Sequence, residues 1–207
     1  MLNHAAGRRI GLLGGSFNPA HDGHRFISQL ALEHLGLDEV WWMVAPQNPL
    51  KPVADMAPFK ERLGAAHHFA NSSAIVVTGI EQELGTRYTA DTIKRLQTRA
   101  PSARFVWLMG ADNLSSVHHW RHWQSIFERV PVAVFDRSPY SFSCLASRAA
   151  VRYRRHRLPA WRAKSLAVQA PPVWTIVLGP RHPASATAIR QGDRRFGFAG
   201  QNDGTTS

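Results

Sequence analysis

Cysteine is almost absent from this chain of 207 residues, since Cys144 is the only one. A disulfide within the chain is therefore excluded, and we expect a reducing, cytoplasmic environment. Long apolar runs are also missing, because none approaches the roughly 20 residues that a membrane-spanning helix needs. The first residues, MLNHAAGRRIGLLGG, contain no long apolar segment followed by a small-residue cleavage site, so no secretory signal is expected.

Negative charge is missing from one long stretch of the chain. Between Arg137 and Gly192 there is no Asp or Glu, while the whole chain carries a formal charge of +11. The ten basic residues of this stretch are Arg137, Arg148, Arg152, Arg154, Arg155, Arg157, Arg162, Lys164, Arg181 and Arg190. Such a basic surface suits a polyanion, namely a nucleic acid, a membrane or a phosphate-rich small molecule, and it is equally compatible with an ordinary solvated surface.

The rest of the composition is that of a folded domain. Hydrophobic residues make up 44% of the chain, and 207 residues suffice for one domain with a sizeable core. We expect this domain to cover residues 1–191. The polar, glycine-rich tail over residues 192–207 is expected to be disordered.

Short apolar runs rich in Val, Ile and Trp alternate with helical patterns along the chain. The runs lack polar alternation, as strands buried on both faces of a parallel sheet do. They are Arg9–Leu13, Val40–Val44, Ala74–Thr78, Phe105–Met109, Val132–Phe135 and Val173–Leu178. The predicted helices are His24–Leu35, Phe59–Phe69, Thr89–Arg99, Trp120–Arg129 and Ser143–Tyr153. This alternation predicts an α/β fold, a Rossmann-like open parallel sheet with helices on both faces in a single domain.

The stretch LLGGSFNPAHDGHR joins the first predicted strand to the first predicted helix. Gly14 and Gly15 permit a tight turn and a close approach of the backbone to a ligand, and Asp22 is predicted to cap the helix. His21 and His24 would then lie at a helix N-terminus on the carboxyl edge of the sheet, where free N–H groups attract phosphate. A zinc site built on this H-x-x-H pair is the alternative, but no third ligand is evident.

This stretch resembles the signature of the H-x-G-H nucleotidyltransferases, here His21-Asp22-Gly23-His24. Further motifs resemble those of the bacterial nicotinate-nucleotide adenylyltransferases and follow in the expected order: RYTADTI at 87–93, LMGADN at 108–113, HHWRHWQSI at 118–126 and SATAIR at 185–190. The resemblance covers nearly the whole chain. The H-x-G-H motif indicates the superfamily, SATAIR resembles its I-S-x-T-x-x-R motif, and the motifs between them point to the nicotinate branch.

The resemblance implies adenylyl transfer from ATP to nicotinate mononucleotide, giving deamido-NAD and pyrophosphate in NAD biosynthesis. Because the attacking group is the substrate's own phosphate, the protein needs no covalent nucleophile; it aligns two anions and stabilises charge on the phosphates. The implied catalytic residues are His21, His24 and Arg190. Mg²⁺ is the implied cofactor, held mostly by ATP and water, and no residue of the chain is assigned as a metal ligand.

The resemblance also implies two sets of binding residues. Those for ATP are Gly14, Gly15, Ser16, Phe17, His21, His24, Gly110, Asp112, Ser185, Thr187 and Arg190. Those for nicotinate mononucleotide are Asn48, Lys51, Thr89, Asp112, Trp120 and Arg137. Thr89 would open a helix whose N–H groups receive the nicotinate carboxylate, Trp120 would stack on the pyridine ring, and Asp112 would bind a ribose hydroxyl. The alternatives are a core position for Trp120, a helix cap for Asp112 and an ordinary loop lysine at Lys51.

Two other interpretations stay open at this point. Another H-x-G-H adenylyltransferase, with nicotinamide mononucleotide or phosphopantetheine as acceptor, would share the first motif; RYTADTI and HHWRHWQSI weigh against phosphopantetheine, whereas nicotinamide mononucleotide is excluded only weakly. A non-enzymatic RNA-binding protein would use the arginines of residues 148–164, but it leaves the histidine pair and SATAIR unexplained. We therefore expect ATP and nicotinate mononucleotide as partners, no membrane and no specific nucleic acid, with the oligomeric state open.

Overall fold

The computed structural model describes residues 2–46, 56–136 and 141–179. Within these ranges the strands form one sheet: β1 (Arg9–Gly15), β2 (Glu39–Val44), β3 (Ile75–Thr78), β4 (Arg104–Gly110), β5 (Val132–Asp136) and β6 (Trp174–Leu178). Every neighbouring pair is parallel, and the order is β3-β2-β1-β4-β5-β6. The predicted open parallel sheet is confirmed.

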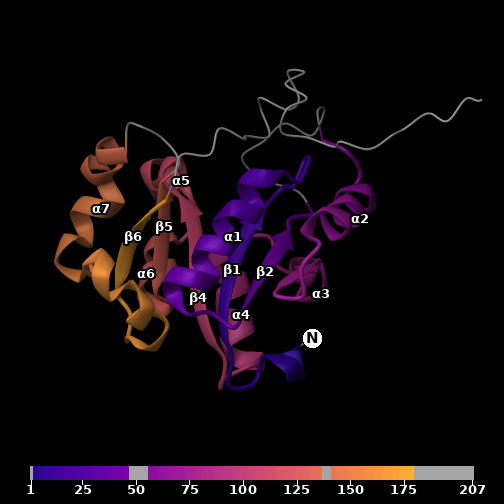
Figure 1. Cartoon of the computed structure of the whole chain (residues 1–207), viewed down its shortest axis with the longest axis horizontal. Helices are drawn as coiled ribbons and strands as arrows, with labels where there is room; N and C mark the ends of the chain where they lie inside the picture. Colours follow the sequence, from indigo (N-terminus) through magenta and orange to yellow (C-terminus); the bar gives the residue numbers. More distant parts are fainter. Residues whose placement is uncertain (1, 47–55, 137–140, 180–207) are drawn as a thin grey trace, which may run out of the picture.

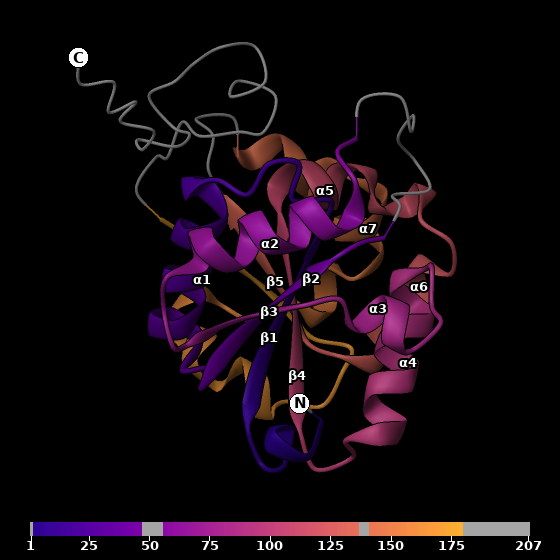
Figure 2. The same ribbon diagram turned by 90° about the vertical axis from the view of Figure 1, so that its right-hand side faces the viewer.

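Helices cover both faces of this sheet (Figure 1 and Figure 2). One face carries α1 (Asp22–Leu35), α2 (Phe59–Ala70) and a 3₁₀ helix over Ala160–Val168. The other face carries α3 (Ile80–Glu83), α4 (Thr89–Arg99), α5 (Ala111–Ser116), α6 (Trp123–Arg129) and α7 (Arg148–Arg152). Shorter 3₁₀ helices span Leu2–Ala5, Val117–His119, Ser141–Ala146 and Arg154–His156.

The strands supply a separate core to each face. All six residues of β2 are buried, and successive side chains of a strand point to opposite faces. Trp41 therefore packs under the α3–α7 layer, whereas Trp42 packs under α1 and α2, and both are fully buried. An uninterrupted apolar run is what such a two-sided strand requires, and this is the pattern from which the strands were predicted.

Two predicted helices begin later than expected or are broken. The helix predicted over Trp120–Arg129 starts only at Trp123, because Trp120 is extended (φ −77°, ψ 142°) and His122 has a positive φ of 53°. The segment predicted as a helix from Ser143 is divided into a 3₁₀ helix and the short α7. Ser147 separates the two in an extended conformation, and its hydroxyl caps α7. The sequence analysis also missed α3 and α5, because short helices show too few turns for an apolar period. It missed the 3₁₀ helix over Ala160–Val168 because three residues per turn do not give the α-helical period.

The strand order reverses between β1 and β4, and this reversal positions the candidate site. The chain leaves β1 at Gly15 toward α1 on one face and leaves β4 at Gly110 toward α5 on the other. Such a switch point opens a crevice at the carboxyl ends of the strands, where ligands bind in open α/β sheets. Across the three described ranges, no helix combines the length and apolar character that crossing a bilayer demands.

Candidate active site

At the carboxyl edge of β1, α1 begins with two histidines arranged as a capping box. His21 is the N-cap residue, and its Nδ1 accepts a hydrogen bond from Gly23 N at 3.1 Å. His24 Nδ1 accepts a hydrogen bond from His21 N at 3.2 Å, and the two ring centroids lie 3.9 Å apart. The predicted cap at Asp22 is therefore wrong. Imidazole nitrogens of His21 and His24 accept the two hydrogen bonds of the capping box, and Asp22 is the first residue of the helix.

These two hydrogen bonds determine where the ring protons lie. A ring nitrogen that accepts a hydrogen bond carries no proton, so each neutral imidazole is protonated at Nε2. Both Nε2–H groups are thus donors at the N-terminus of α1, where the helix dipole also favours an anion. A metal ion would need the lone pair of Nε2, which this tautomer does not offer. Among the described residues, no three His, Cys, Asp or Glu side chains gather into a metal site.

Phe17 forms an aromatic support below the histidine pair. Its ring is only 1% exposed and lies 4.5 Å from the His24 ring and 5.2 Å from the Trp42 ring. Trp42 Nε1 donates to Ser28 Oγ at 2.8 Å, and Ser28 Oγ donates to His24 O at the same distance. The predicted ATP contact of Phe17 would therefore have to come from its backbone, which has a positive φ of 46°. Its ring positions His24.

Packing beneath the loop excludes a side chain at Gly14 without a shift of Trp107 and leaves little room for one at Gly15. A Cβ at Gly14 would lie 2.7 Å from Trp107 Cη2, and one at Gly15 would lie 3.3 Å from Phe17 Cε2. Gly110 ends β4 and serves as the extended N-cap residue of α5. Gly14, Gly15 and Gly110 lie at the carboxyl edge of the sheet, as does Ser16 after β1. The contacts of these residues with the ATP phosphates stay predictions.

Asp112 and Thr89 both lie in the first turn of a helix. Asp112 is the second residue of α5, half a turn beyond the cap Gly110, so its interpretation as the cap is wrong. Its side chain is exposed and remains a candidate for a ribose hydroxyl. Thr89 opens α4 as predicted, directly after the extended residue Tyr88. The first intrahelical bond runs from Asp91 N to Tyr88 O, so the N–H groups of Thr89 and the next residue precede it.

Trp120 packs at the margin of the core, and its stacking on the pyridine ring stays a prediction. Its ring meets Trp107 edge to face with centroids 6.3 Å apart, and it packs at the margin of the core as a half-buried side chain. The neighbouring Arg121 lies over the ring of Tyr88 at 4.8 Å. This contact brings the segment of Trp120 beside the start of α4. Trp120 and Thr89, which are predicted to contact the pyridine ring and its carboxylate, therefore lie in neighbouring segments.

Six predicted site residues lie outside the described residues. They are Asn48, Lys51, Arg137, Ser185, Thr187 and Arg190. Their assignments to the mononucleotide phosphate and to the ATP phosphates stay predictions. The expected disorder of residues 192–207, which also lie outside the described residues, stays a prediction too.

Arg62 of α2 is a functional candidate that the sequence analysis missed. It is 3% exposed, and its Nη1 donates to Ser16 O at 2.5 Å and to Ala45 O at 2.9 Å. Its Nη2 donates to Pro46 O at 2.9 Å and its Nε to Ala57 O at 2.8 Å. Burial lowers the pKa of the guanidinium. Arg62 thus joins the loop after β1 to the segments that follow β2 and precede α2. A single arginine in an amphipathic helix gives no sequence signal for this role.

A buried carboxyl group lies beside the turn of residues 86–88, which precedes α4. Glu81 is 8% exposed, and its Oε1 accepts a hydrogen bond from Thr92 Oγ1 at 3.3 Å. Thr92 Oγ1 lies 2.8 Å from Thr86 Oγ1. Burial raises the pKa of Glu81 to about 7, and the hydrogen bond from Thr92 opposes this rise. The sequence analysis missed Glu81 as well, since nothing in the pattern around it distinguishes a buried glutamate from a solvated one.

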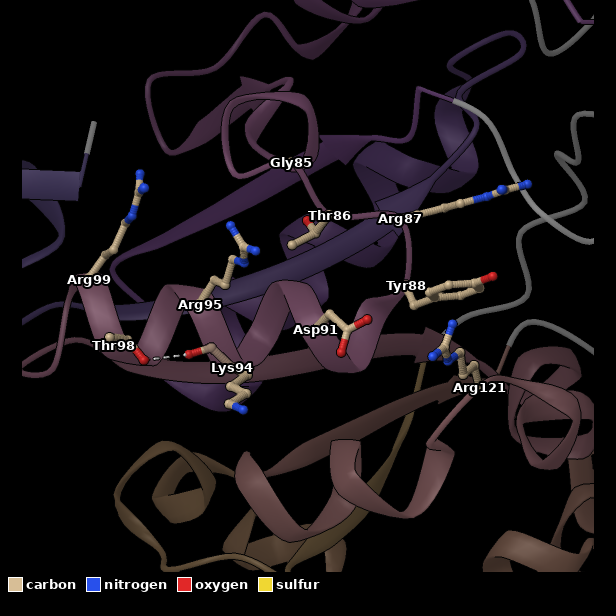
Figure 3. A pocket seen from close by; sticks show the side chains of 10 residues that line it. All are labelled: Gly85, Thr86, Arg87, Tyr88, Asp91, Lys94, Arg95, Thr98, Arg99 and Arg121. Carbon is tan, nitrogen blue, oxygen red and sulfur yellow. Dashed lines mark hydrogen bonds between the residues drawn. The ribbon is translucent and has the colours of Figure 1, made fainter.

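A cavity of about 570 Å³ runs along α4 from this turn (Figure 3). Its charged lining consists of Arg87, Asp91, Lys94, Arg95, Arg99 and Arg121. In Figure 3 the basic side chains point in different directions rather than toward one point. Arg95 Nη1 already donates to Leu84 O at 2.6 Å. The groove therefore borders the start of α4 without forming a focused anion site.

The basic cluster of residues 148–164 lies on α7 and the 3₁₀ helices that follow it. All of its arginines, and Lys164, are exposed. Three of them lie over aromatic rings: Arg152 over Tyr153 and Arg157 over Trp174, each at 5.7 Å, and Arg162 over Trp161 at 5.9 Å. The cluster thus has a packing role for part of its members, and a polyanionic partner for it stays a hypothesis.

Comparison with known proteins agrees with the geometry. A family model described as Cytidylyltransferase-like matches residues 12–192. A probable nicotinate-nucleotide adenylyltransferase of Methylorubrum extorquens is 47% identical over 182 residues, which cover 88% of this chain and 98% of that protein. One from a Bradyrhizobium species is 49% identical over 185 residues, covering 89% of this chain and 96% of that protein. This chain belongs to the nicotinate-nucleotide adenylyltransferase family.

Membership of the nicotinate-nucleotide adenylyltransferases confirms the resemblance predicted from the H-x-G-H signature and the motifs after it. A solved structure of Plasmodium falciparum nicotinic acid mononucleotide adenylyltransferase complexed with NaAD has a TM-score of 0.68 at 15% identity, covering 89% of this chain and 83% of that one. Its likeness concerns the fold alone. The family and the Rossmann-like sheet are thus established together.

Proposed function

We infer that this chain transfers the adenylyl group of ATP to nicotinate mononucleotide, releasing pyrophosphate and forming deamido-NAD in NAD biosynthesis. The observation that carries this inference is the pair of Nε2–H donors of His21 and His24 at the start of α1. In a member of this family, two neutral donors beside a helix N-terminus match the needs of phosphate chemistry. The pair lies at the crevice between the ends of β1 and β4.

The reaction needs alignment and charge stabilisation more than acid–base chemistry. A phosphate oxygen of the mononucleotide attacks the α-phosphorus of ATP, and the bond from that phosphorus to the bridging oxygen breaks, leaving its electrons on pyrophosphate. The attacking phosphate is already ionised, so no base has to remove a proton from it. His21 and His24 donate to the phosphate oxygens on which negative charge increases, while Phe17 keeps the His24 ring in place.

The pyridine end of the second substrate would lie at the start of α4. The N–H groups at Thr89 and Ala90 and the helix dipole favour an anionic carboxylate there. Trp120, held edge to face by Trp107, supplies a ring face for stacking on the pyridine. Asp112 at the start of α5 would accept hydrogen bonds from a ribose hydroxyl.

The remaining assignments concern residues outside the described ranges and the metal ion. Asn48, Lys51 and Arg137 would bind the mononucleotide phosphate, as the resemblance implies. Ser185, Thr187 and Arg190 would bind the ATP phosphates, as the resemblance implies. Mg²⁺ would arrive as part of the ATP complex, held mainly by phosphate oxygens and water, which are the ligands it prefers. In that complex the ion neutralises charge on the phosphates.

The test is pyrophosphate release by the purified protein with ATP and each of three acceptors: nicotinate mononucleotide, nicotinamide mononucleotide and phosphopantetheine. We expect kcat/KM for the acid to exceed that for the amide by at least about a hundredfold, because an amide would direct an NH₂ donor at the N–H donors of α4. Equal efficiency with the amide would refute the carboxylate assignment. Preference for phosphopantetheine would refute the proposed acceptor altogether.

A further inference from the structure

Glu81 is a buried ionisable group that the proposed reaction does not use. It lies in α3 with 8% of its surface exposed, and among the described residues no lysine, arginine or histidine forms an ion pair with it. Burying a carboxyl group away from a cation is unfavourable, and an apolar residue would occupy the same space at lower cost. Stability therefore does not explain why a glutamate occupies this position.

The contacts of Glu81 lead to the two ends of the turn before α4. At one end, Thr86 N donates to Glu81 O at 2.9 Å, and Thr86 Oγ1 lies 2.8 Å from Thr92 Oγ1. At the other end, Thr92 Oγ1 lies 3.2 Å from Tyr88 O, the carbonyl that precedes Thr89. The same Thr92 hydroxyl donates to Glu81 Oε1 at 3.3 Å. The Thr92 hydroxyl thus contacts both ends of the turn, and its single proton is donated either to Glu81 Oε1 or to Tyr88 O.

We propose that Glu81 is a positioning residue for recognition of the pyridine carboxylate. Through Thr92 and Thr86 it holds the turn of residues 86–88, so that the N–H groups at the start of α4 point at the carboxylate of nicotinate mononucleotide. This proposal rests on the proposed function. Its effect is confined to one substrate, because the ATP donors His21 and His24 begin a different helix on the opposite face of the sheet.

The hydroxyl partners suit this role whether or not Glu81 is ionised. A threonine hydroxyl both donates and accepts. With an ionised Glu81, hydrogen bonds run from Thr86 to Thr92 and from Thr92 to the carboxylate; with a protonated Glu81, the chain runs in the reverse direction. Both directions use the same pairs of oxygen atoms. Glutamine, whose carbonyl oxygen also accepts, should therefore replace Glu81 with little loss of recognition, whereas alanine should not.

The test compares Glu81→Ala, Glu81→Gln and Thr92→Val with a control on the same helix. Thr98 is exposed, and its hydroxyl donates to Lys94 O at 3.0 Å. Thr98→Val therefore removes a hydrogen bond of the same type within α4, from a threonine hydroxyl to the carbonyl four residues earlier, without affecting residues 86–88. We expect Glu81→Ala and Thr92→Val to raise KM for nicotinate mononucleotide about tenfold. KM for ATP and kcat should change by less than about twofold, and Glu81→Gln and Thr98→Val should resemble the unaltered chain.

Binding of nicotinate mononucleotide alone, measured by calorimetry, gives a readout independent of turnover. Weaker binding by Thr92→Val, without a matching change for Thr98→Val, is the expected result. The proposal is overturned if KM rises equally for both substrates, since that indicates a general structural defect, or if neither Glu81→Ala nor Thr92→Val alters binding. Should Glu81→Ala fail to fold, Thr92→Val, which preserves side-chain shape, decides the question. Failure of the proposed function would instead be visible in the unaltered chain, as absence of turnover with nicotinate mononucleotide.

Discussion

Replacement of Arg62 by methionine is expected to destabilise the loops at the carboxyl edge of the sheet. Methionine fills the space of the arginine stem but donates no hydrogen bond. Arg62→Met therefore removes the partners of four backbone carbonyls, at Ser16, Ala45, Pro46 and Ala57. A net hydrogen bond contributes about 1 kcal/mol to stability, and one to a charged donor contributes more.

The expected loss of unfolding free energy follows from these contacts. Four bonds at about 1 kcal/mol each, a net value that already includes desolvation of donor and acceptor, give a loss of at least about 4 kcal/mol. For a chain of this size a loss of about 4 kcal/mol lowers Tm by about 8–16 °C. Because Arg62 also positions the loop at Ser16, kcat/KM should fall together for ATP and for nicotinate mononucleotide.

Thermal and urea denaturation at pH 7 measure this loss, and Arg99→Met is the matched control. Arg99 is exposed at the end of α4, so its replacement should change stability by less than about 0.5 kcal/mol. If Arg62→Met costs less than about 1 kcal/mol, or no more than the control, the four carbonyl contacts do not hold the loops together and the argument fails.

Three further outcomes are expected. His24→Ala should lower kcat by about 10²–10³ with Tm unchanged within a few degrees; His34→Ala, on the exposed end of the same helix, should leave kcat normal, and a normal kcat in the His24 variant would remove that residue from catalysis. Trp120→Ala should weaken the binding of nicotinate and nicotinamide mononucleotides by a similar factor, because stacking does not distinguish carboxylate from amide. If the binding of only one of the two were weakened, the stacking role would be contradicted. Burial raises the pKa of Glu81 from 4.5 to about 7, so the folded chain binds more protons than the unfolded chain between these values, and stability contributed by this group is lost as the pH rises through that window. Glu81→Gln should therefore gain up to about 3 kcal/mol relative to the unaltered chain between pH 5 and pH 8 in urea titrations, and parallel pH profiles would refute the raised pKa.

Local pattern was sufficient for the strands, for the longer helices α1, α2 and α4, and for the family. Strands such as Val40–Val44 are predictable because a two-sided strand must be apolar at every position, and α1 and α4 because their buried residues recur at helical spacing. The short α3 and α5 are too short for a period to appear. The break at His122 was missed because a positive φ at a residue other than glycine has no sequence signature.

The sequence by itself determined which chemical groups are available: two histidines at a strand-to-helix junction, glycines before them, and a tryptophan and threonine in later motifs. Only the tertiary structure decided how these groups act. It showed that His21 rather than Asp22 caps α1 and that Nδ1 of both histidines accepts a backbone hydrogen bond, from which protonation at Nε2 follows. It also placed Arg121 of the Trp120 segment over Tyr88 and gave Arg62 and Glu81 their buried partners. The physical reason is range, since helix and strand propensities depend on neighbours along the chain, whereas hydrogen-bond partners and burial depend on residues that meet only after folding.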